Sequence, residues 1–184
     1  AQAERCKKIV SGLLNFARKN QVKLEEIDLK KLAEDSLASV VKPDNIKTGV
    51  ICRGSNLKAN LDYEQMMQVL TNLNKNAIEA MPNGGTLVVE VETTDTEVTF
   101  SVRDTGVGIP EEHMDKLYTP FFTTKGIGKG TGLGLATTYG IVKMHKGRIE
   151  VESNTDAHRG QTGTIFRIIL PRDSMTLESE LDSK

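Results

Sequence analysis

The sequence predicts an α/β fold, a two-layer sandwich in which three helices lie on one face of a mixed sheet. β-rich runs follow one another in pairs, as in hairpins, at residues 86–104 and 147–170. Three longer stretches, at 29–40, 63–81 and 133–145, have apolar residues at helical spacing. Paired strands favour a mixed or antiparallel sheet over a doubly wound parallel one, and helices beside such a sheet give two layers.

Residues 1–21 are predicted to form an N-terminal helix that precedes the sandwich. Apolar residues recur at helical spacing from Cys6 to Ala17, and we expect this stripe to pack on another helix or another chain. Because the chain begins without Met inside this pattern, we expect it to be part of a longer protein. Residues 22–171 are predicted to form the folded domain, and the polar segment 172–184 is predicted to be disordered.

Each element of the folded domain has a local signal. A weakly alternating run at 22–29 predicts a strand, and Asp28 is the expected N-cap of the helix at 29–40. Asp62 is the expected N-cap of the helix at 63–81. The other predicted elements are strands at 49–53 and 56–60 joined by Gly54 and Ser55, a hairpin of strands at 86–94 and 97–104, a short helix at 111–117, a mobile loop at 119–132, and strands at 147–153 and 163–170 around a polar loop.

Composition excludes several classes of protein. The formal net charge is −1 over 184 residues, so no basic surface for nucleic acid is expected. Aromatic residues make up 4%, with no Trp, which argues against a surface for stacking bases. Cys6 and Cys52 lie far apart, so we expect free thiols in a reducing compartment. No apolar run reaches the roughly 18 residues of a membrane span, so no membrane contact by this chain is expected.

Asp104 and the glycines after it form the first candidate site. The segment Asp104–Pro110 closes a β-rich run. A carboxylate is costly to bury without a donor, so Asp104 at the end of an apolar strand is expected to accept a hydrogen bond. Gly106 and Gly108 allow a close approach of the backbone or a positive φ. Taken alone, the pattern is also that of an ordinary turn after a strand.

The helix at 63–81 carries the second candidate site. Asn72, Asn76 and Glu79 follow one face at helical spacing, beside an apolar stripe. Asn is a mediocre residue for a helix interior, and an amide oxygen suits Mg²⁺ beside phosphate oxygens. The alternative is a solvated helix face.

The third candidate site is the glycine-rich segment before the helix at 133–145. Gly130, Gly132 and Gly134 would present backbone N–H groups and the positive end of a helix dipole to an anion, and Lys125 adds positive charge. The spacing is not that of a P-loop, and no βαβ unit precedes it. The alternative is a flexible solvent loop.

Together these segments resemble sensor histidine kinases. Four of them match that family's motifs in its order and at its usual separations: Asn72–Asn76 the N box, Asp104–Pro110 the first glycine box, Thr119–Lys125 the F box and Gly130–Leu135 the second glycine box. The resemblance covers about Ile27 to Leu170 and implies the Bergerat fold of the GHKL group of ATP-binding domains. Residues 1–19 resemble the second helix of the family's dimerisation and phosphotransfer hairpin.

On the adenine side, the resemblance implies a role for five residues. Asp104 would accept a hydrogen bond from the adenine amino group. Gly106 and Gly108, followed by Ile109, would let the backbone pass the purine. Thr164 would reach the adenine through water.

On the phosphate side, the resemblance implies that Asn76 coordinates a Mg²⁺ that bridges the phosphates of ATP. Asn72 stands where hydrolysing relatives carry a Glu, and an amide cannot act as a general base. Lys125 would contact the γ-phosphate, so Asn72 and Lys125 are the expected catalytic residues. A lid at 111–131 is expected to be mobile without nucleotide. The second glycine box supplies the remaining expected contacts: Gly130, Thr131, Gly132, Leu133 and Gly134.

The chain departs from the family pattern at three places. Asn74 and Lys75 replace an apolar pair, so Lys75 is expected to be exposed or near phosphate. Lys146 stands where the family often has Gly. The family's phosphoacceptor is a His that an acidic residue follows. None of the three histidines of this chain is followed by an acidic residue, so we expect structural or surface roles for them: His113, His145 and His158.

The resemblance therefore implies a kinase that binds Mg·ATP and transfers the γ-phosphoryl group to a His on a hairpin helix absent from this chain. The expected partners are the receiver domain of a response regulator and, through the hairpin, a second copy. We expect the chain to be cytoplasmic, whether or not its parent is membrane-anchored. Two alternatives stay open: another GHKL ATPase or protein-serine kinase, such as an anti-sigma factor, and a module that binds ATP without transferring phosphate.

Overall fold

A computed structural model describes residues 22–125 and 130–172 of the chain. The helix predicted at 1–21 and residues 173–184 of the tail predicted at 172–184 lie outside the described residues. Arg172, the first residue of that tail, is described, and its N–H donates to the Thr96 carbonyl at 2.8 Å. The mobility predicted for the loop at 119–132 stays a prediction, because residues 126–129 are also outside the described residues.

Five strands form one mixed sheet, as expected. In spatial order they are β2 (Ile46–Arg53), β4 (Gly85–Thr93), β5 (Glu97–Asp104), β7 (Gly163–Pro171) and β6 (Arg148–Asn154). β2 and β4 run parallel, whereas every other neighbouring pair is antiparallel. The hairpin predicted at 86–104 is confirmed as β4 and β5.

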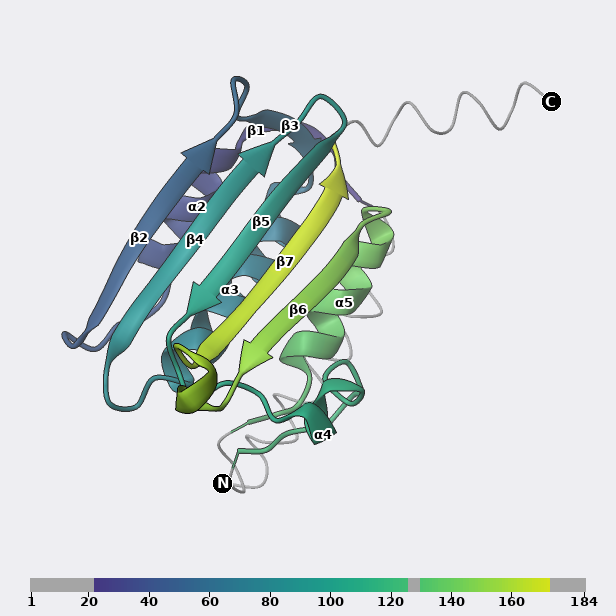
Figure 1. Cartoon of the computed structure of the whole chain (residues 1–184). Helices are drawn as coiled ribbons and strands as arrows, with labels where there is room; N and C mark the ends of the chain where they lie inside the picture. The colour runs from purple at the N-terminus through teal and green to yellow at the C-terminus, as the bar shows by residue number, and fades with distance from the viewer. Residues whose placement is uncertain (1–21, 126–129, 173–184) are drawn as a thin grey trace.

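Three helices cover one face of this sheet, which confirms the two-layer sandwich. Figure 1 shows α2 (Leu29–Ala38), α3 (Tyr63–Glu79) and α5 (Gly134–Met144) behind the strands, and the short α4 (Glu111–Met114) near the start of α5. Inward-facing side chains alternate along each strand, so Val98, Phe100 and Val102 of β5 are buried in the core under α3.

Both predicted N-caps are confirmed. The Asp28 carboxylate accepts a hydrogen bond from the Lys31 N–H at 3.0 Å, and the Asp62 carboxylate accepts one from the Gln65 N–H at 2.9 Å. Each cap satisfies a backbone donor that the first turn of a helix leaves free.

The strands on either side of Gly54 and Ser55 do not pair with each other. β2 enters the main sheet, while β3 (Lys58–Leu61) pairs with β1 (Glu25–Asp28) in a separate two-stranded sheet. The local pattern predicts extended backbone at both places. It does not specify the partner strand, which lies 30 to 39 residues away in the sequence.

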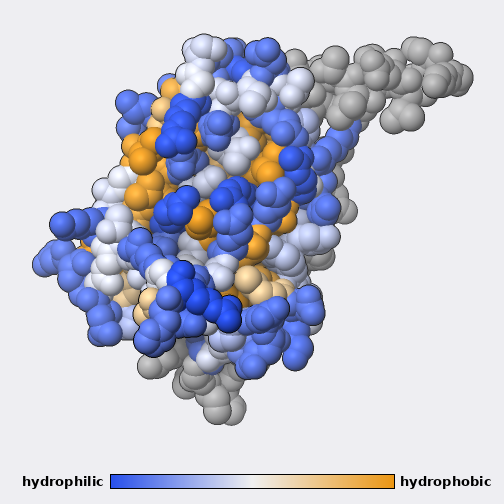
Figure 2. Space-filling view, in the orientation of Figure 1, coloured by the Kyte–Doolittle hydropathy of each residue, from blue (hydrophilic) through white to orange (hydrophobic). Residues whose placement is uncertain are grey.

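None of the helices in residues 22–125 and 130–172 lies on the second face of the main sheet (Figure 1). Figure 2 shows this face, where apolar side chains lie between charged ones. Ile51 is 45% exposed there, and Arg53 forms an ion pair with Glu90 at 3.0 Å. Within the described residues, none of the helices has the length and apolar character that crossing a membrane requires.

Candidate functional site

Asp104 lies at the end of β5 and is almost fully buried, with 7% of its surface exposed. Its Oδ1 atom accepts hydrogen bonds from the N–H groups of Gly106 at 2.8 Å and Thr164 at 3.3 Å. Burial raises the pKa of the Asp104 carboxyl, and these two hydrogen bonds oppose that shift. Within residues 22–125 and 130–172, Oδ2 has no protein donor. The donors that the sequence predicts for Asp104 are thus the N–H groups of Gly106 and Thr164, and Oδ2 stays available to a ligand; the contact with adenine stays a prediction.

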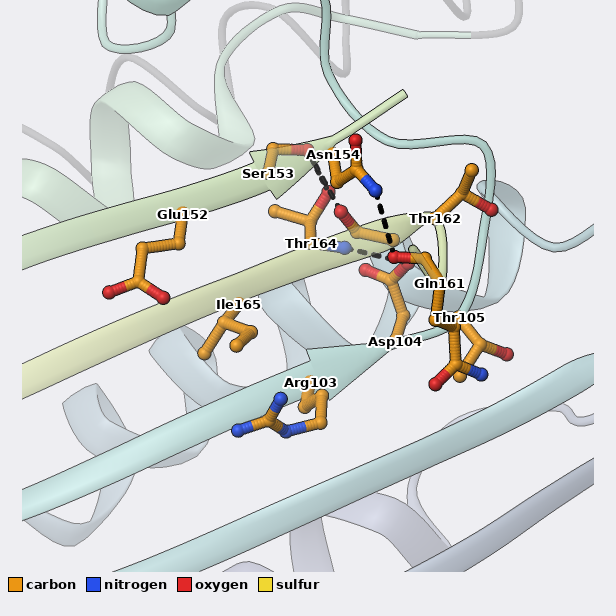
Figure 3. A pocket seen from close by; sticks show the side chains of 11 residues that line it. Arg103, Asp104, Thr105, Glu152, Ser153, Asn154, Gln161, Thr162, Thr164 and Ile165 are labelled. Carbon is orange, nitrogen blue, oxygen red and sulfur yellow. Dashed lines mark hydrogen bonds between the residues drawn. The ribbon is translucent and has the colours of Figure 1, made fainter. Parts of the chain in front are cut away.

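A hydroxyl pair on β6 and β7 supports Asp104, and one member of it was not expected from the sequence. The Ser153 hydroxyl accepts from the Ile109 N–H at 2.7 Å, donates to the Gly163 carbonyl at 3.0 Å and lies 3.0 Å from the Thr164 hydroxyl. Thr164 is 3% exposed. Figure 3 shows Ser153, Thr164 and Asp104 side by side at the strand ends. Ser153 thus joins the first glycine box to the strands that hold Asp104.

The glycines of the Asp104 motif pack against protein backbone. A Cβ atom on Gly106 would lie 2.5 Å from the Ala80 carbonyl oxygen, and one on Gly108, whose φ is 76°, would lie 2.4 Å from the Asn154 carbonyl oxygen. The Val107 N–H donates to the Ala80 carbonyl at 3.0 Å. The structure thus gives a packing reason for both glycines, and their expected contact with the purine stays a prediction.

The polar face of α3 meets the glycine-rich segment and the F box. The Asn72 side-chain amide donates to the Gly134 carbonyl at 3.4 Å, a long hydrogen bond. The Lys125 ammonium donates to the Asn76 amide oxygen at 3.1 Å and forms an ion pair with Glu79. Segments 46 to 62 residues apart in sequence are therefore adjacent at one end of α3.

Asn74 and Lys75, the departure between the two asparagines, point in different directions. Asn74 is fully buried against α2, where its amide donates to the Ser36 hydroxyl at 3.1 Å. Lys75 is exposed, one of the two outcomes expected for it. A buried amide that is bonded to the neighbouring helix replaces the usual apolar contact.

The second glycine box leads directly into α5. Gly132 has a φ of 66°, its carbonyl accepts from the Phe121 N–H at 2.9 Å, and a Cβ atom there would lie 2.3 Å from the Phe121 backbone. The Leu133 N–H donates to the Thr131 hydroxyl at 3.4 Å, whereas a Cβ atom on Gly130 would crowd the Thr123 hydroxyl at 2.8 Å. Among the residues that the structure describes, no side chain caps the start of α5. Its first N–H groups can therefore bind an anion.

His145 confirms the structural role predicted for it. It is 1% exposed at the end of α5; its Nδ1 lies 2.9 Å from the Ile141 carbonyl oxygen, and its Nε2 accepts from the Asp62 N–H at 3.3 Å. Burial lowers the pKa of the His145 imidazole, so the ring is neutral at pH 7. The next residue, Lys146, adopts a φ of 57°, the conformation that favours the Gly of the family pattern.

The other two histidines lie away from α3. His113 of α4 is partly exposed and packs edge-on against Phe122, with ring centroids 5.6 Å apart. His158 lies in an exposed single-turn helix between β6 and β7. Neither contacts the residues around Asp104 or Asn76 through a hydrogen bond within the part of the chain described.

A pocket of about 310 Å³ lies at the same strand ends, and part of its lining comes from the face of the sheet without helices (Figure 3). Arg103 pairs with Ile165, and Ile165 pairs with Glu152, across the three strands. These residues alternate with the inward-facing Asp104 and Thr164, so they face away from the helices (Figure 3). Asp104, Ser153 and Thr164 line the pocket as well, so it adjoins the strand ends that hold the Asp104 carboxylate.

The polar groups of the candidate site fit a nucleotide that brings its own cation. Among the described residues, no group of three or more His, Cys, Asp or Glu side chains could hold a metal ion. A hard cation at Asn76 would thus need most of its oxygen ligands from a bound ligand and water. Asp104 supplies a buried acceptor, and α5 supplies an uncapped N-terminus.

Comparisons with known proteins agree with this geometry. Residues 61–174 match the model of the histidine kinase-, DNA gyrase B- and HSP90-like ATPase family. Sporulation kinase A of Bacillus subtilis is 37% identical over 94% of this chain, which spans only 28% of that kinase's length. The solved catalytic domain of histidine kinase ThkA is 30% identical, with a TM-score of 0.71 over 83% of this chain and 98% of that domain. A second ThkA structure matches 95% of this chain and 49% of that one at 26% identity, with a TM-score of 0.74. The chain belongs to the histidine kinase-, DNA gyrase B- and HSP90-like ATPase family, as the ATP-binding domain of a sensor histidine kinase.

Proposed function

We propose that this domain binds Mg·ATP between the Asp104 strand end, the polar face of α3 and the start of α5, and that it transfers the γ-phosphoryl group to a protein histidine. The observation that carries the proposal is the unpaired Oδ2 of the buried Asp104, which lies beside a backbone loop tied to α3 through Val107 and Ala80. The exocyclic amino group of adenine is a donor, and guanine has a carbonyl oxygen at that position, so a carboxylate acceptor selects ATP over GTP.

Positioning and charge neutralisation provide the catalysis, as in phosphoryl transfer generally. Asn76 is the proposed ligand of Mg²⁺, which would neutralise phosphate charge. Lys125 and the first N–H groups of α5 bind phosphate oxygens. Asn72 lies beside them without a titratable group, so no side chain of the N box deprotonates water there. This favours transfer to a protein acceptor over hydrolysis.

The proposed partners follow from the relatives. A structure of histidine kinase ThkA is a complex with the response regulator protein TrrA, and we propose a response regulator as the final acceptor here. The acceptor histidine and a homodimer interface would belong to the hairpin whose second helix resembles residues 1–19. A cytoplasmic location is proposed for the domain, because that is where a receiver domain would meet it.

The test adds a hairpin that carries the acceptor histidine to this chain, together with ATP labelled in the γ-phosphate. We expect an acid-labile, base-stable phosphohistidine on the hairpin, which then transfers its label to a receiver domain. Nucleotide binding without any phosphohistidine would show a binding module instead. Steady release of phosphate without the hairpin, unchanged by Asn72→Ala, would show that Asn72 does not have the proposed role.

A further inference from the structure

Lys125 places its ammonium group between two oxygen ligands of one helix. Its Nζ atom donates to the Asn76 amide oxygen at 3.1 Å and to the Glu79 carboxylate. Asn76 and Glu79 are three residues apart on α3, so their side chains lie on the same face. The Lys125 and Glu79 side chains are 36% and 33% exposed, so the contact is open to solvent and to ligands.

The end of α3 attracts cations. Glu79 is the last residue of the helix, and its last turn contains no basic residue. The carbonyl groups at a helix C-terminus carry partial negative charge, which disfavours a carboxylate and favours a cation there. Lys75 lies one turn before Glu79 and is exposed, but the ion pair that Glu79 forms among the described residues is with Lys125 of the F box, which supplies the positive charge in contact with it.

Stability does not account for this arrangement. Ion pairs of this exposure contribute little to folding, because solvent screens them and two long side chains lose freedom. An amide oxygen and a carboxylate one turn apart are, however, the kind of hard ligands that Mg²⁺ and Mn²⁺ bind. Two protein oxygens fill only a part of an octahedral shell, so the other ligands would be phosphate oxygens and water.

We propose that Asn76 and Glu79 together form a cation site, which the Lys125 ammonium fills in this structure and which the divalent cation of the nucleotide takes over. Glu79 is thereby a second metal ligand beside Asn76, and Lys125 is an internal competitor that becomes available to the phosphates once it is displaced. The exchange keeps the charge at the end of α3 balanced both before and after the nucleotide binds. The claim that the cation of the nucleotide displaces Lys125 rests on the proposed function. The claim that Asn76 and Glu79 bind a cation does not.

The first experiment measures Mn²⁺ binding to the protein without nucleotide, by electron paramagnetic resonance of the free ion. Lys125→Met should bind Mn²⁺ about fivefold more tightly than the original chain, the scale of one exposed ion pair. Adding Glu79→Gln to Lys125→Met should abolish this gain. Lys75→Met is the matched control, since it removes an exposed lysine of the same helix. A Lys125→Met protein with unchanged Mn²⁺ affinity, or a gain that survives Glu79→Gln, would overturn the proposal.

The second experiment measures ATP binding by calorimetry, once with Mg²⁺ and once with EDTA. Glu79→Gln should weaken binding about fivefold with Mg²⁺, because a metal ligand is lost, and leave it equal or tighter with EDTA, because Lys125 is released to the phosphates. A loss of the same size in both conditions would mean a structural role for Glu79 and overturn the proposal. Failure of the original chain to bind ATP would instead contradict the proposed function, and the Mn²⁺ result would still test the cation site.

Discussion

The two sides of the proposed nucleotide site are built differently. The adenine side consists of Asp104, Ser153, Thr164 and the loop 105–109. Asp104 and Thr164 are buried, and the polar atoms of this side are joined by hydrogen bonds of 2.7 to 3.3 Å. The phosphate side, Asn72, Asn76, Glu79 and Lys125 with the segment 130–134, is partly exposed. The side chains of α3 contact the other two segments through a 3.4 Å hydrogen bond and the two contacts of a flexible lysine. The short contact there is between backbones, from the Phe121 N–H to the Gly132 carbonyl at 2.9 Å.

This difference assigns distinct tasks to the two sides. A buried, preorganised acceptor can distinguish adenine from guanine, because an imperfectly matched ligand leaves polar groups unpaired. In the proposed function, the phosphate side would admit a metal ion, reach an acceptor histidine and release ADP, and contacts that break easily would suit it. The comparison leads to four predictions.

The largest effect is expected on the adenine side, from Asp104→Asn. Asn can still accept from Gly106 through its carbonyl oxygen, but its amide group would present a donor to the adenine amino group. ATP affinity should fall roughly tenfold to hundredfold, the scale of a lost hydrogen bond to a charged group. Calorimetry measures this, and an unchanged thermal midpoint confirms the fold. If Asp104→Asn and the original chain bind ATP equally well, Asp104 does not recognise the base.

A pair of glycine substitutions compares the packing of the two sides. Gly106→Ala places a Cβ atom 2.5 Å from the Ala80 carbonyl, whereas Gly134→Ala places one 3.8 Å from Asn72, an ordinary contact. Gly106→Ala should lower the free energy of unfolding by about 1–3 kcal/mol, as overpacking does, and Gly134→Ala should leave it equal or raise it. Urea unfolding measures both. Gly49→Ala is the control, because nothing lies within 4 Å of its Cβ position. Equal losses at Gly106 and Gly134 would contradict the difference between the sides.

Asn76→Ala tests the phosphate side. It removes the proposed amide ligand of the metal, so the gain in ATP affinity on adding Mg²⁺ should shrink about tenfold, or by about 1.4 kcal/mol. Binding in EDTA should change little. Comparative calorimetry with Mg²⁺ and with EDTA gives both values. If the full Mg²⁺ effect persists in Asn76→Ala, the metal ligand lies elsewhere.

The smallest effect is a pH dependence from His145, which lies outside both sides. Its pKa is lowered in the folded protein, mainly by burial, from the ordinary value of 6.5. Below pH 6.5 the unfolded chain therefore binds more protons at His145 than the folded chain does. The free energy of unfolding is unaffected by His145 above pH 6.5 and falls as the pH drops from 6.5 toward the pKa of the folded protein. The slope cannot exceed about 1.4 kcal/mol per pH unit for one group. Urea unfolding from pH 7.5 to 5.5 should show a slope that His145→Asn removes, with His158→Gln as the matched histidine control. An unchanged slope in His145→Asn would contradict this assignment.

Local chemistry made much of the fold predictable. Asp28 and Asp62 mark helix starts because their carboxylates bond to the third N–H that follows each of them. Period-2 and period-3.6 patterns located the strands and helices, because burial on one face imposes them. The parallel pairing of β2 with β4 and the antiparallel pairing of β3 with β1 were not predictable in this way. Those pairings depend on how distant segments pack, which no short window contains.

The candidate site divides in the same manner. Asp104, Asn72 and Asn76 were found from residue type and spacing, since a strand-end carboxylate and stacked asparagines are unusual where they stand. Ser153 was missed, although its hydroxyl joins Ile109, Gly163 and Thr164, because a serine late in an alternating strand is ordinary. The sequence held one signal for it: Ser153 continues the inward-facing alternation of Ile149 and Val151, so a polar side chain stands where an apolar one is expected.

The sequence by itself therefore determined the order of the elements, the four motifs and the family. Only the tertiary structure decided that Gly106 and Gly108 are packed against backbone, that Ser153 supports Asp104, and that Lys125 lies between Asn76 and Glu79. The physical reason is the distance along the chain over which each kind of interaction acts. Caps and periodicities act over a few residues, whereas these contacts join atoms from segments 26 to 49 residues apart, and folding alone brings those segments together.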